Sequence, residues 1–185
     1  MRGFSLIETL VAVVILVSAI VGPLTLAQRS IRSAVYARDQ VTASFLAEEA
    51  IEYIRMMRDG NELRRRSNWL FGLSGDCLEQ LCQIDTREDR DDAVSQCSRR
   101  EGPLYESNCF PLAFEKVTGK YGYGTGVGWE NTQFVREVRI DTIPNGDRTS
   151  DDEAKVEVKV LWKTGDLPLR TVTVPLTPLP CFFAN

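Results

Sequence analysis

Residues 10–27 read LVAVVILVSAIVGPLTLA, eighteen consecutive residues without a charge. As an α-helix this stretch would be about 27 Å long, close to the thickness of the hydrocarbon core of a bilayer. Three interpretations are open: a cleaved secretory signal, a plain single-pass anchor, and a helix that assembles with other helices. For a signal, Arg2 is the basic residue, and Thr25-Leu26-Ala27 is an acceptable cleavage site after the break at Gly22-Pro23.

Glu8 lies at the edge of this apolar stretch, and neither a signal nor a plain anchor explains it. A charge at the centre of a membrane helix costs about 2–3 kcal/mol, and less near the interface. A compensating positive charge is therefore expected, and an assembling helix can receive it from another molecule.

The residues around Glu8 also carry a resemblance to a known family. Type IV pilins and type II secretion pseudopilins have a prepilin processing signal that is similar to Gly3-Phe4-Ser5-Leu6-Ile7-Glu8-Thr9-Leu10-Val11. The resemblance implies that a prepilin peptidase cuts after Gly3, removes residues 1–3 as a leader and methylates the new N-terminal Phe4. It also implies that Glu8 pairs with the Phe4 amine of a neighbouring subunit, an ion pair that would specify register in an apolar filament core. Two features depart from the family: Thr9 replaces an apolar residue, and the leader is short and weakly basic.

Gly22-Pro23 interrupts the apolar stretch. Proline removes a backbone donor and clashes with the preceding turn, so a kink or local unwinding is expected there. Many pilins have a helix-breaking proline in a similar place. A kink of the kind that any membrane helix tolerates is the alternative.

The helix is predicted to continue past the apolar stretch. Residues 4–27 would form a transmembrane or filament-core helix, and residues 28–59 an amphipathic spine. In the spine, apolar residues recur every three or four positions, among them Ile31, Val35, Phe45, Leu46, Ala50, Tyr53, Ile54 and Met57. Gly60 and Asn61 provide a suitable stop. Residues 4–58 would then make a rod of about 80 Å.

Residues 60–133 lack a clear period and predict an irregular region that contains cysteines. The candidates for disulfides are Cys77, Cys82, Cys97 and Cys109, and Cys181 is left over. All five cysteines fall after residue 76 and none lies in the first helix, which indicates an oxidising compartment; four cysteines allow three connectivities. Reduced thiols and zinc are the alternatives, but the chain has neither a C-x2-C pair nor a histidine, so we expect no metal and no cofactor.

Other features of the chain predict ordinary structure. Arg64-Arg65-Arg66 is better explained as solvated surface than as a lipid or DNA site, and Trp69-Leu70-Phe71 should pack onto the spine. Residues 119–128 lack the ending of a phosphate loop and predict a turn-rich loop. The cluster of Asp147, Asp151, Asp152 and Glu153 lacks EF-hand spacing and predicts a solvated loop rather than a calcium site.

Residues 134–185 predict an antiparallel β-sheet. Apolar residues alternate with polar ones through residues 154–163, a turn follows at Thr164-Gly165-Asp166, and a return strand covers residues 167–176. Residues 134–141 predict a third strand. The predicted fold class is therefore α+β, with a long N-terminal helix, hydrophobic and then amphipathic, packed on a C-terminal antiparallel sheet. This order matches the type IV pilin fold.

Composition argues against several functions. The chain has 22 Lys+Arg and 26 Asp+Glu, a net charge of −4, and no histidine. A net-acidic chain is a poor partner for nucleic acid. Without histidine, the commonest general base is missing, and we find no nucleophile elbow or nucleotide loop. We therefore expect a protein that is not an enzyme.

The resemblance implies a structural minor pilin or pseudopilin of a type IV pilus or type II secretion-like filament. Its partners would be other pilin subunits, the prepilin peptidase, the inner-membrane assembly platform and the lipid bilayer. It would cross the cell (inner) membrane once, with the C-terminal domain outside the cytoplasm, and then enter an extracellular or periplasmic filament. The alternative is a membrane-anchored extracytoplasmic domain that binds a ligand or mediates adhesion without polymerising.

Overall fold

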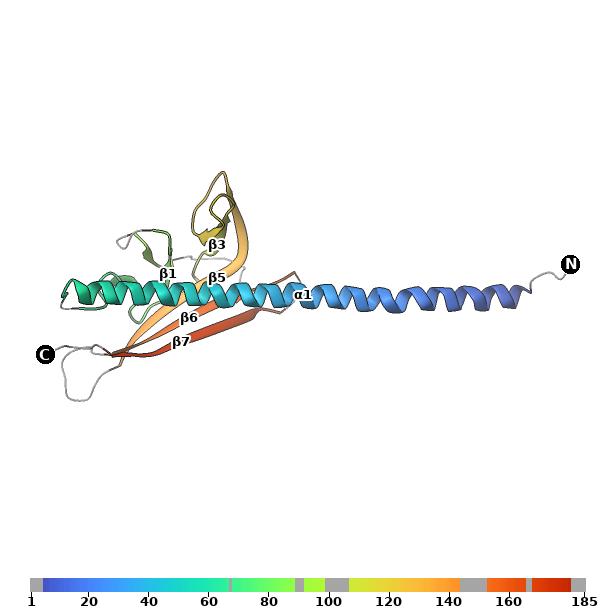
Figure 1. The fold of residues 1–185 in the computed structure, drawn as a ribbon, viewed down its shortest axis with the longest axis horizontal. Helices are drawn as coiled ribbons and strands as arrows, with labels where there is room; N and C mark the ends of the chain where they lie inside the picture. Colours follow the sequence, from blue (N-terminus) through green and yellow to red (C-terminus); the bar gives the residue numbers. More distant parts are fainter. Residues whose placement is uncertain are drawn as a thin grey trace. The chain divides into compact units, whose positions relative to one another are not determined.

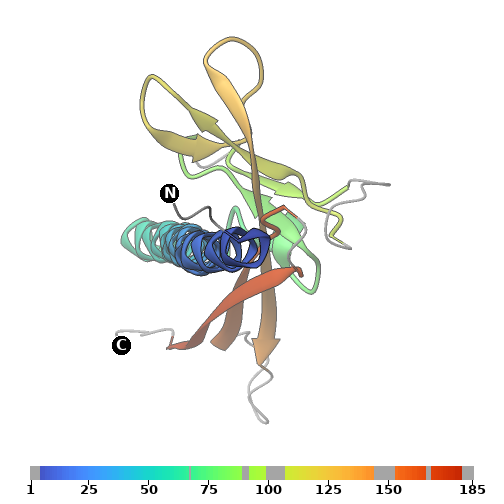
Figure 2. The ribbon, with the colours of Figure 1, turned by 90° about the vertical axis from the view of Figure 1, so that its right-hand side faces the viewer.

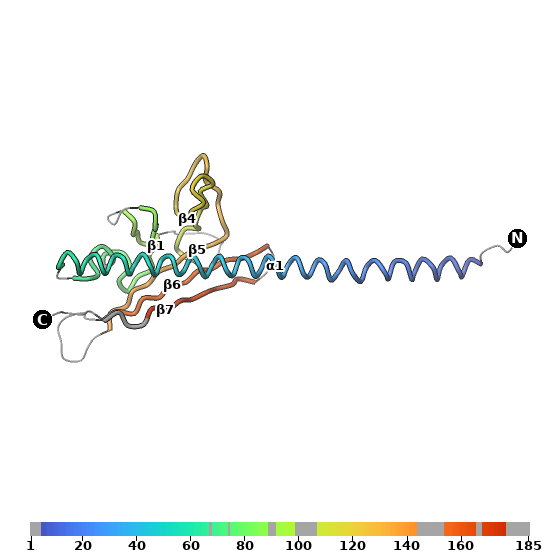
Figure 3. Tube along the Cα trace, in the orientation of Figure 1, coloured from blue at the N-terminus to red at the C-terminus, as the bar shows by residue number. Residues whose placement is uncertain are grey.

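The computed structural model of the chain describes residues 5–66, 68–88, 92–98, 107–143, 153–165 and 168–180. The chain divides into two compact units, Met1–Gln40 and Val41–Asn185. In chain order the elements are α1 (Leu6–Leu63), α2 (Ser74–Cys77), β1 (Cys82–Ile84), β2 (Val94–Gln96), β3 (Pro111–Glu115), β4 (Lys120–Gly122), β5 (Trp129–Ile143), β6 (Glu153–Trp162) and β7 (Arg170–Pro180). Figures 1 and 3 show their succession from blue to red. This α+β arrangement confirms the predicted fold class.

The first unit is helical from Leu6 onward. α1 continues without a break through Gly22 and Pro23, so the local unwinding expected there does not occur, while a bend stays a prediction. The Thr25 hydroxyl donates to the Gly22 carbonyl over 2.8 Å, which supplies a local hydrogen bond beside the proline. Proline removes one backbone hydrogen bond, and the remaining helix on both sides is long enough to continue past it.

The second unit contains the end of α1, which extends to Leu63 rather than stopping at Gly60 and Asn61. The Asn61 side chain is buried and donates to the backbone carbonyls of Trp69 and Phe71 over 2.7 and 2.9 Å. Asn61 therefore anchors the segment after the helix instead of capping it. Trp69 and Leu70 are buried, as predicted for a segment packed on the spine, whereas Phe71 is half exposed beneath the guanidinium of Arg66.

The strands form one seven-stranded sheet organised around β5. β3 and β1 pair with one edge of β5 at different positions along it, and β6 pairs with the other edge. β2 extends the sheet from β1, β4 from β3 and β7 from β6, and all of these pairings are antiparallel. Figure 2 shows β5 reaching from the β3–β4 hairpin to the β6–β7 hairpin. β5 is fifteen residues long, so both hairpins can pair with it: β3 pairs along residues 129–135 and β6 along residues 135–143.

Residues 60–133 contain more regular structure than predicted. The region holds α2, β1, β2, β3 and β4, and β5 begins at Trp129, five residues before the expected start. Three of these strands are only three residues long. A strand of three residues is too short to display an alternating pattern, which explains why the sequence of residues 60–133 predicted an irregular region.

The predicted antiparallel hairpin is present as β6 and β7, but β7 begins and ends at other residues than predicted. β7 covers Arg170–Pro180 instead of residues 167–176, and it includes Pro175. Proline is tolerated in edge strands, where its missing N–H need not face a partner. In the described part of the chain, β7 pairs only with β6.

The core of the second unit lies between the helix and the sheet. The second half of α1 runs alongside β5, β6 and β7 (Figures 1 and 2). Its buried side chains recur at helical spacing: Ala43, Leu46, Ala47, Ala50, Ile51, Ile54 and Met57. From the sheet, β5 and β6 contribute Val135, Val138, Ile140, Val156, Val158, Val160 and Trp162. Fully burying a branched aliphatic side chain contributes about 1.5–3 kcal/mol, so this core is the main source of stability for the unit.

Candidate functional site

The apolar part of α1 is exposed along its length. Every residue from 5 to 34 is solvent-exposed, including Leu6, Val13, Ile15, Leu16, Ile20 and Leu24. Soluble proteins rarely leave so long an apolar surface uncovered. α1 is long and apolar enough to cross a membrane once.

Glu8 lies on this exposed surface, in the first turn of α1. Its neighbours at Leu6, Ile7, Leu10 and Val11 are exposed apolar side chains. Within the described ranges, no side chain forms an ion pair with Glu8. Gly3 and Phe4, the predicted processing and assembly residues, lie outside the described residues, so the proposed pairing of Phe4 with Glu8 stays a prediction.

The four candidate cysteines form two disulfides. Cys77 is bonded to Cys82 and Cys97 to Cys109. The first bond joins the end of α2 to the start of β1, and the second packs in a cluster with Val135 and Leu161. Cys181 lies outside the described residues. A sequence alone offers three pairings, and the structure contains the one in which each of the four cysteines is bonded to its neighbour in the chain order.

Arg136 on β5 is a buried cation that sequence reasoning missed. Its side chain is fully buried, and it donates to the Leu46 carbonyl over 3.0 Å and to the Ile84 carbonyl over 2.6 Å. It also donates to the Glu49 carboxylate over 3.1 Å. A buried charge is tolerated when it is paired and hydrogen-bonded. The sequence signal that could have found it is its spacing of two and four residues from Val138 and Ile140, which places Arg136 on the same face of the strand as these two residues.

A second polar cluster joins the loop after β1 to the loop after β4. The Arg87 guanidinium donates to both Asp85 oxygens over 3.0 and 2.7 Å, and it lies 4.3 Å from the centre of the Trp129 ring. The Tyr123 amide donates to Asp85 over 3.0 Å. Burial raises the pKa of the Tyr123 hydroxyl to about 12, although the nearby Arg136 guanidinium acts in the opposite direction. Both clusters hold loops and strands together through these hydrogen bonds.

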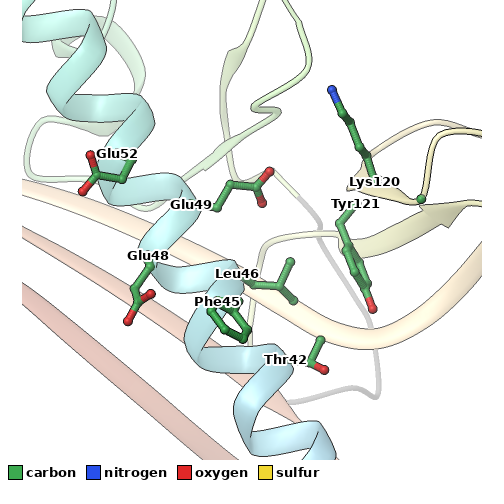
Figure 4. A pocket seen from close by; sticks show the side chains of 9 residues that line it. Thr42, Phe45, Leu46, Glu48, Glu49, Glu52, Lys120 and Tyr121 are labelled. Atoms are coloured by element: carbon green, nitrogen blue, oxygen red, sulfur yellow. The ribbon is translucent and has the colours of Figure 1, made fainter.

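A groove of about 560 Å³ runs between α1 and the β3–β4 turn (Figure 4). α1 contributes Thr42, Phe45, Leu46, Glu48, Glu49 and Glu52, and Gly119, Lys120 and Tyr121 lie across from it. Phe45 is two-thirds exposed, an unusual state for a large aromatic side chain. The groove therefore combines an apolar floor with carboxylates on the helix side.

Asp147, Asp151 and Asp152 of the acidic cluster lie outside the described residues, so the solvated loop stays a prediction. No protein-family model matches the chain, and neither do any of the curated proteins or the solved structures with which we compared it. The fold and the exposed helix together define an α+β protein with an N-terminal apolar helix that is able to span a membrane.

Proposed function

We propose that this chain is a minor pilin or pseudopilin, a structural subunit of a type IV pilus or type II secretion-like filament. In this proposal residues 1–3 are a leader that a prepilin peptidase removes. The mature chain crosses the inner membrane once, exposes its C-terminal domain outside the cytoplasm and passes through an assembly platform into the filament. It performs no catalysis.

The observation that carries the proposal is the position of Glu8. Its carboxylate lies on an uncovered apolar helix, and the described residues supply it with no positive charge. A membrane-anchored monomer gains nothing from this arrangement, since a charge near lipid costs free energy. In a bundle of identical helices, the amine of Phe4 on one subunit can neutralise Glu8 on the next.

Further support comes from the order of the elements. A long helix that is apolar and then amphipathic, with an antiparallel sheet on its second half, suits a filament subunit. The first half is available for a helical core, while the sheet covers the second half. The two disulfides support exposure to an oxidising compartment, because such bonds are rare in the cytosol.

Mass spectrometry of the membrane-bound and filament-bound protein tests the proposal. We expect an N-terminus at a methylated Phe4. Glu8→Val should insert into the membrane and fail to enter filaments, whereas Thr9→Val, a matched change one residue away, should enter normally. A chain that keeps Met1, resides in the membrane and never appears in filaments would instead support the anchored, non-polymerising alternative. Normal incorporation of Glu8→Val would contradict the pairing role.

A further inference from the structure

One exposed face of α1 combines an aromatic side chain with carboxylates. Phe45, Glu48 and Glu52 are spaced by three and four residues and therefore share a face, and all three line the groove in Figure 4. Glu49 beside them is already held by Arg136 and Thr86, and Glu52 by Arg55. Within the described ranges, Glu48 forms no ion pair. We call Phe45, Glu48 and Glu52 the acidic face.

Another exposed face of the same helix has the opposite charge. Leu26, Arg29 and Arg32 follow one another at intervals of three residues, and all three are exposed. No acidic residue lies within four positions of Arg29 or Arg32 in the sequence. No ion pair to either arginine occurs among the residues that the structure describes. We call Leu26, Arg29 and Arg32 the basic face.

The two faces match in order, with the third pair displaced by one residue. Positions 26 and 45 differ by nineteen, as do positions 29 and 48, and positions 32 and 52 differ by twenty. A single shift in a parallel helix pair therefore places Leu26 beside Phe45 and Arg29 beside Glu48. The same shift places Arg32 within one residue of Glu52. Charges on one helix pair only when they are three or four residues apart, so these partners cannot meet within α1.

We propose that the basic face of one copy of this chain packs in parallel along the acidic face of a second copy, in the groove beside the β3–β4 turn. This inference rests on the proposed function and deepens it by naming a contact between subunits. The two faces are different surfaces, so each copy can use both, and the contact adds copies without closing on itself. The shift of nineteen residues differs from the shift of four that would bring Phe4 to Glu8. The two contacts therefore involve two different neighbours.

Cross-linking between two tagged full-length copies tests the contact. One copy carries Arg29→Cys and the other carries Glu48→Cys, and both are produced in the same cells and oxidised in the membrane or filament. We expect a dimer that contains both tags. Replacing Glu48→Cys with Glu62→Cys, at an exposed acidic residue about 21 Å further along α1, should abolish that dimer. Equal cross-linking at positions 48 and 62, or none at position 48, would overturn the proposal.

Charge exchange provides a second measurement that does not depend on new cysteines. Exposed ion pairs are individually weak, so reversing both arginines to glutamate should reduce co-purification of the two tagged copies by about tenfold. When the copy with glutamate at positions 29 and 32 is produced together with a copy carrying Glu48→Arg and Glu52→Arg, co-purification should be restored. A loss that the exchange does not restore would assign Arg29 and Arg32 to anionic lipid headgroups and would overturn the proposal.

Determining the N-terminal residue in the same samples distinguishes a failure of the proposed contact from a failure of the proposed function. A chain that begins at Phe4 and enters filaments, but shows no dimer between positions 29 and 48, contradicts only the contact. A chain that keeps Met1 and stays out of filaments contradicts the proposed function itself.

Discussion

The Nη1 atom of Arg136 donates to Oε2 of Glu49 over 3.1 Å, and this hydrogen bond joins the central strand β5 to helix α1. The Arg136 side chain is fully buried, while that of Glu49 is 40% exposed at the edge of the groove. The guanidinium also binds the carbonyls of Leu46 and Ile84, so one side chain connects α1, β1 and β5. The second unit therefore depends on a polar contact at the centre of its core.

Replacing Arg136 should destabilise the folded unit strongly. Arg136→Met fills similar space but leaves the Ile84 carbonyl and Glu49 without their donor, and we expect a loss of about 3 kcal/mol in the free energy of unfolding. Glu49→Gln keeps an acceptor but leaves the fully buried guanidinium without its counter-charge, so we expect a loss of about 3 kcal/mol for this variant as well. Urea unfolding of the full chain in detergent measures both. A loss well below about 1 kcal/mol for either variant would contradict a structural role of the buried pair.

Removing the disulfides should have unequal effects. Closing a longer loop restricts the unfolded chain more, and Cys97–Cys109 spans twelve residues while Cys77–Cys82 spans five. In the loop-entropy model the first contributes about 3 kcal/mol and the second about 2 kcal/mol. We expect a lower melting temperature for the Cys97→Ser and Cys109→Ser double variant than for the Cys77→Ser and Cys82→Ser one.

A reductant is the control for the disulfide variants. It should lower the melting temperature of the wild-type chain and have a smaller effect on each double variant. A wild-type chain whose unfolding is insensitive to reductant would contradict the contribution of both bonds.

The sequence predicted elements well where a pattern extended over many residues. The apolar stretch and the amphipathic spine span more than fifty residues, and alternation from Val156 to Trp162 defined β6. In contrast, β1, β2 and β4 have three residues each: β1 pairs with β5, β4 pairs with β3, and β2 pairs with β1. Contacts between segments far apart in the sequence decide such strands, and no local period reveals them.

Side-chain roles that depend on the fold were also hidden in the sequence. Asn61 resembled a helix stop but anchors Trp69 and Phe71 through hydrogen bonds. Arg136 received no role from the sequence, and its charge is tolerated in the core because α1 provides a carbonyl and a carboxylate for it. In contrast, Glu8 could be singled out from the sequence, because its apolar surroundings lie next to it in the chain.

Gly124 provides a steric test of the cluster around Trp129. A Cβ atom at Gly124 would collide with the indole ring of Trp129, whereas one at Gly75 in α2 would meet nothing within 4 Å. Overpacking of this kind usually costs about 1–3 kcal/mol. We therefore expect Gly124→Ala to lower the free energy of unfolding by that amount and Gly75→Ala to be neutral or slightly stabilising. Thermal unfolding of both full-length variants measures the difference, and a stable Gly124→Ala chain would contradict the close contact.

Asp85 should give the stability of this protein a specific dependence on acid pH. Burial alone would raise the pKa of Asp85, but hydrogen bonds from Arg87 and from the Tyr123 amide hold the pKa below its ordinary value of 3.8. The folded state therefore prefers the ionised carboxylate. Its contribution is complete above the unfolded pKa and is lost as the pH falls through the lower, folded pKa.

The substitution Asp85→Asn removes this dependence. At neutral pH the variant should lose about 1–3 kcal/mol, because Arg87 keeps its charge but loses its nearer carboxylate partner and retains only the longer contact with Glu115 at 3.7 Å. As the pH falls below about 4, the wild-type chain should lose stability faster than Asp85→Asn, so that the two unfolding free energies converge. Asp92→Asn, at an exposed acidic residue, should follow the wild-type curve. Parallel stability curves for Asp85→Asn and the wild type from pH 7 to 3 would show that the ion pair with Arg87 does not depress the pKa of Asp85. Only a depressed pKa makes the stability difference between the two proteins shrink as the pH falls.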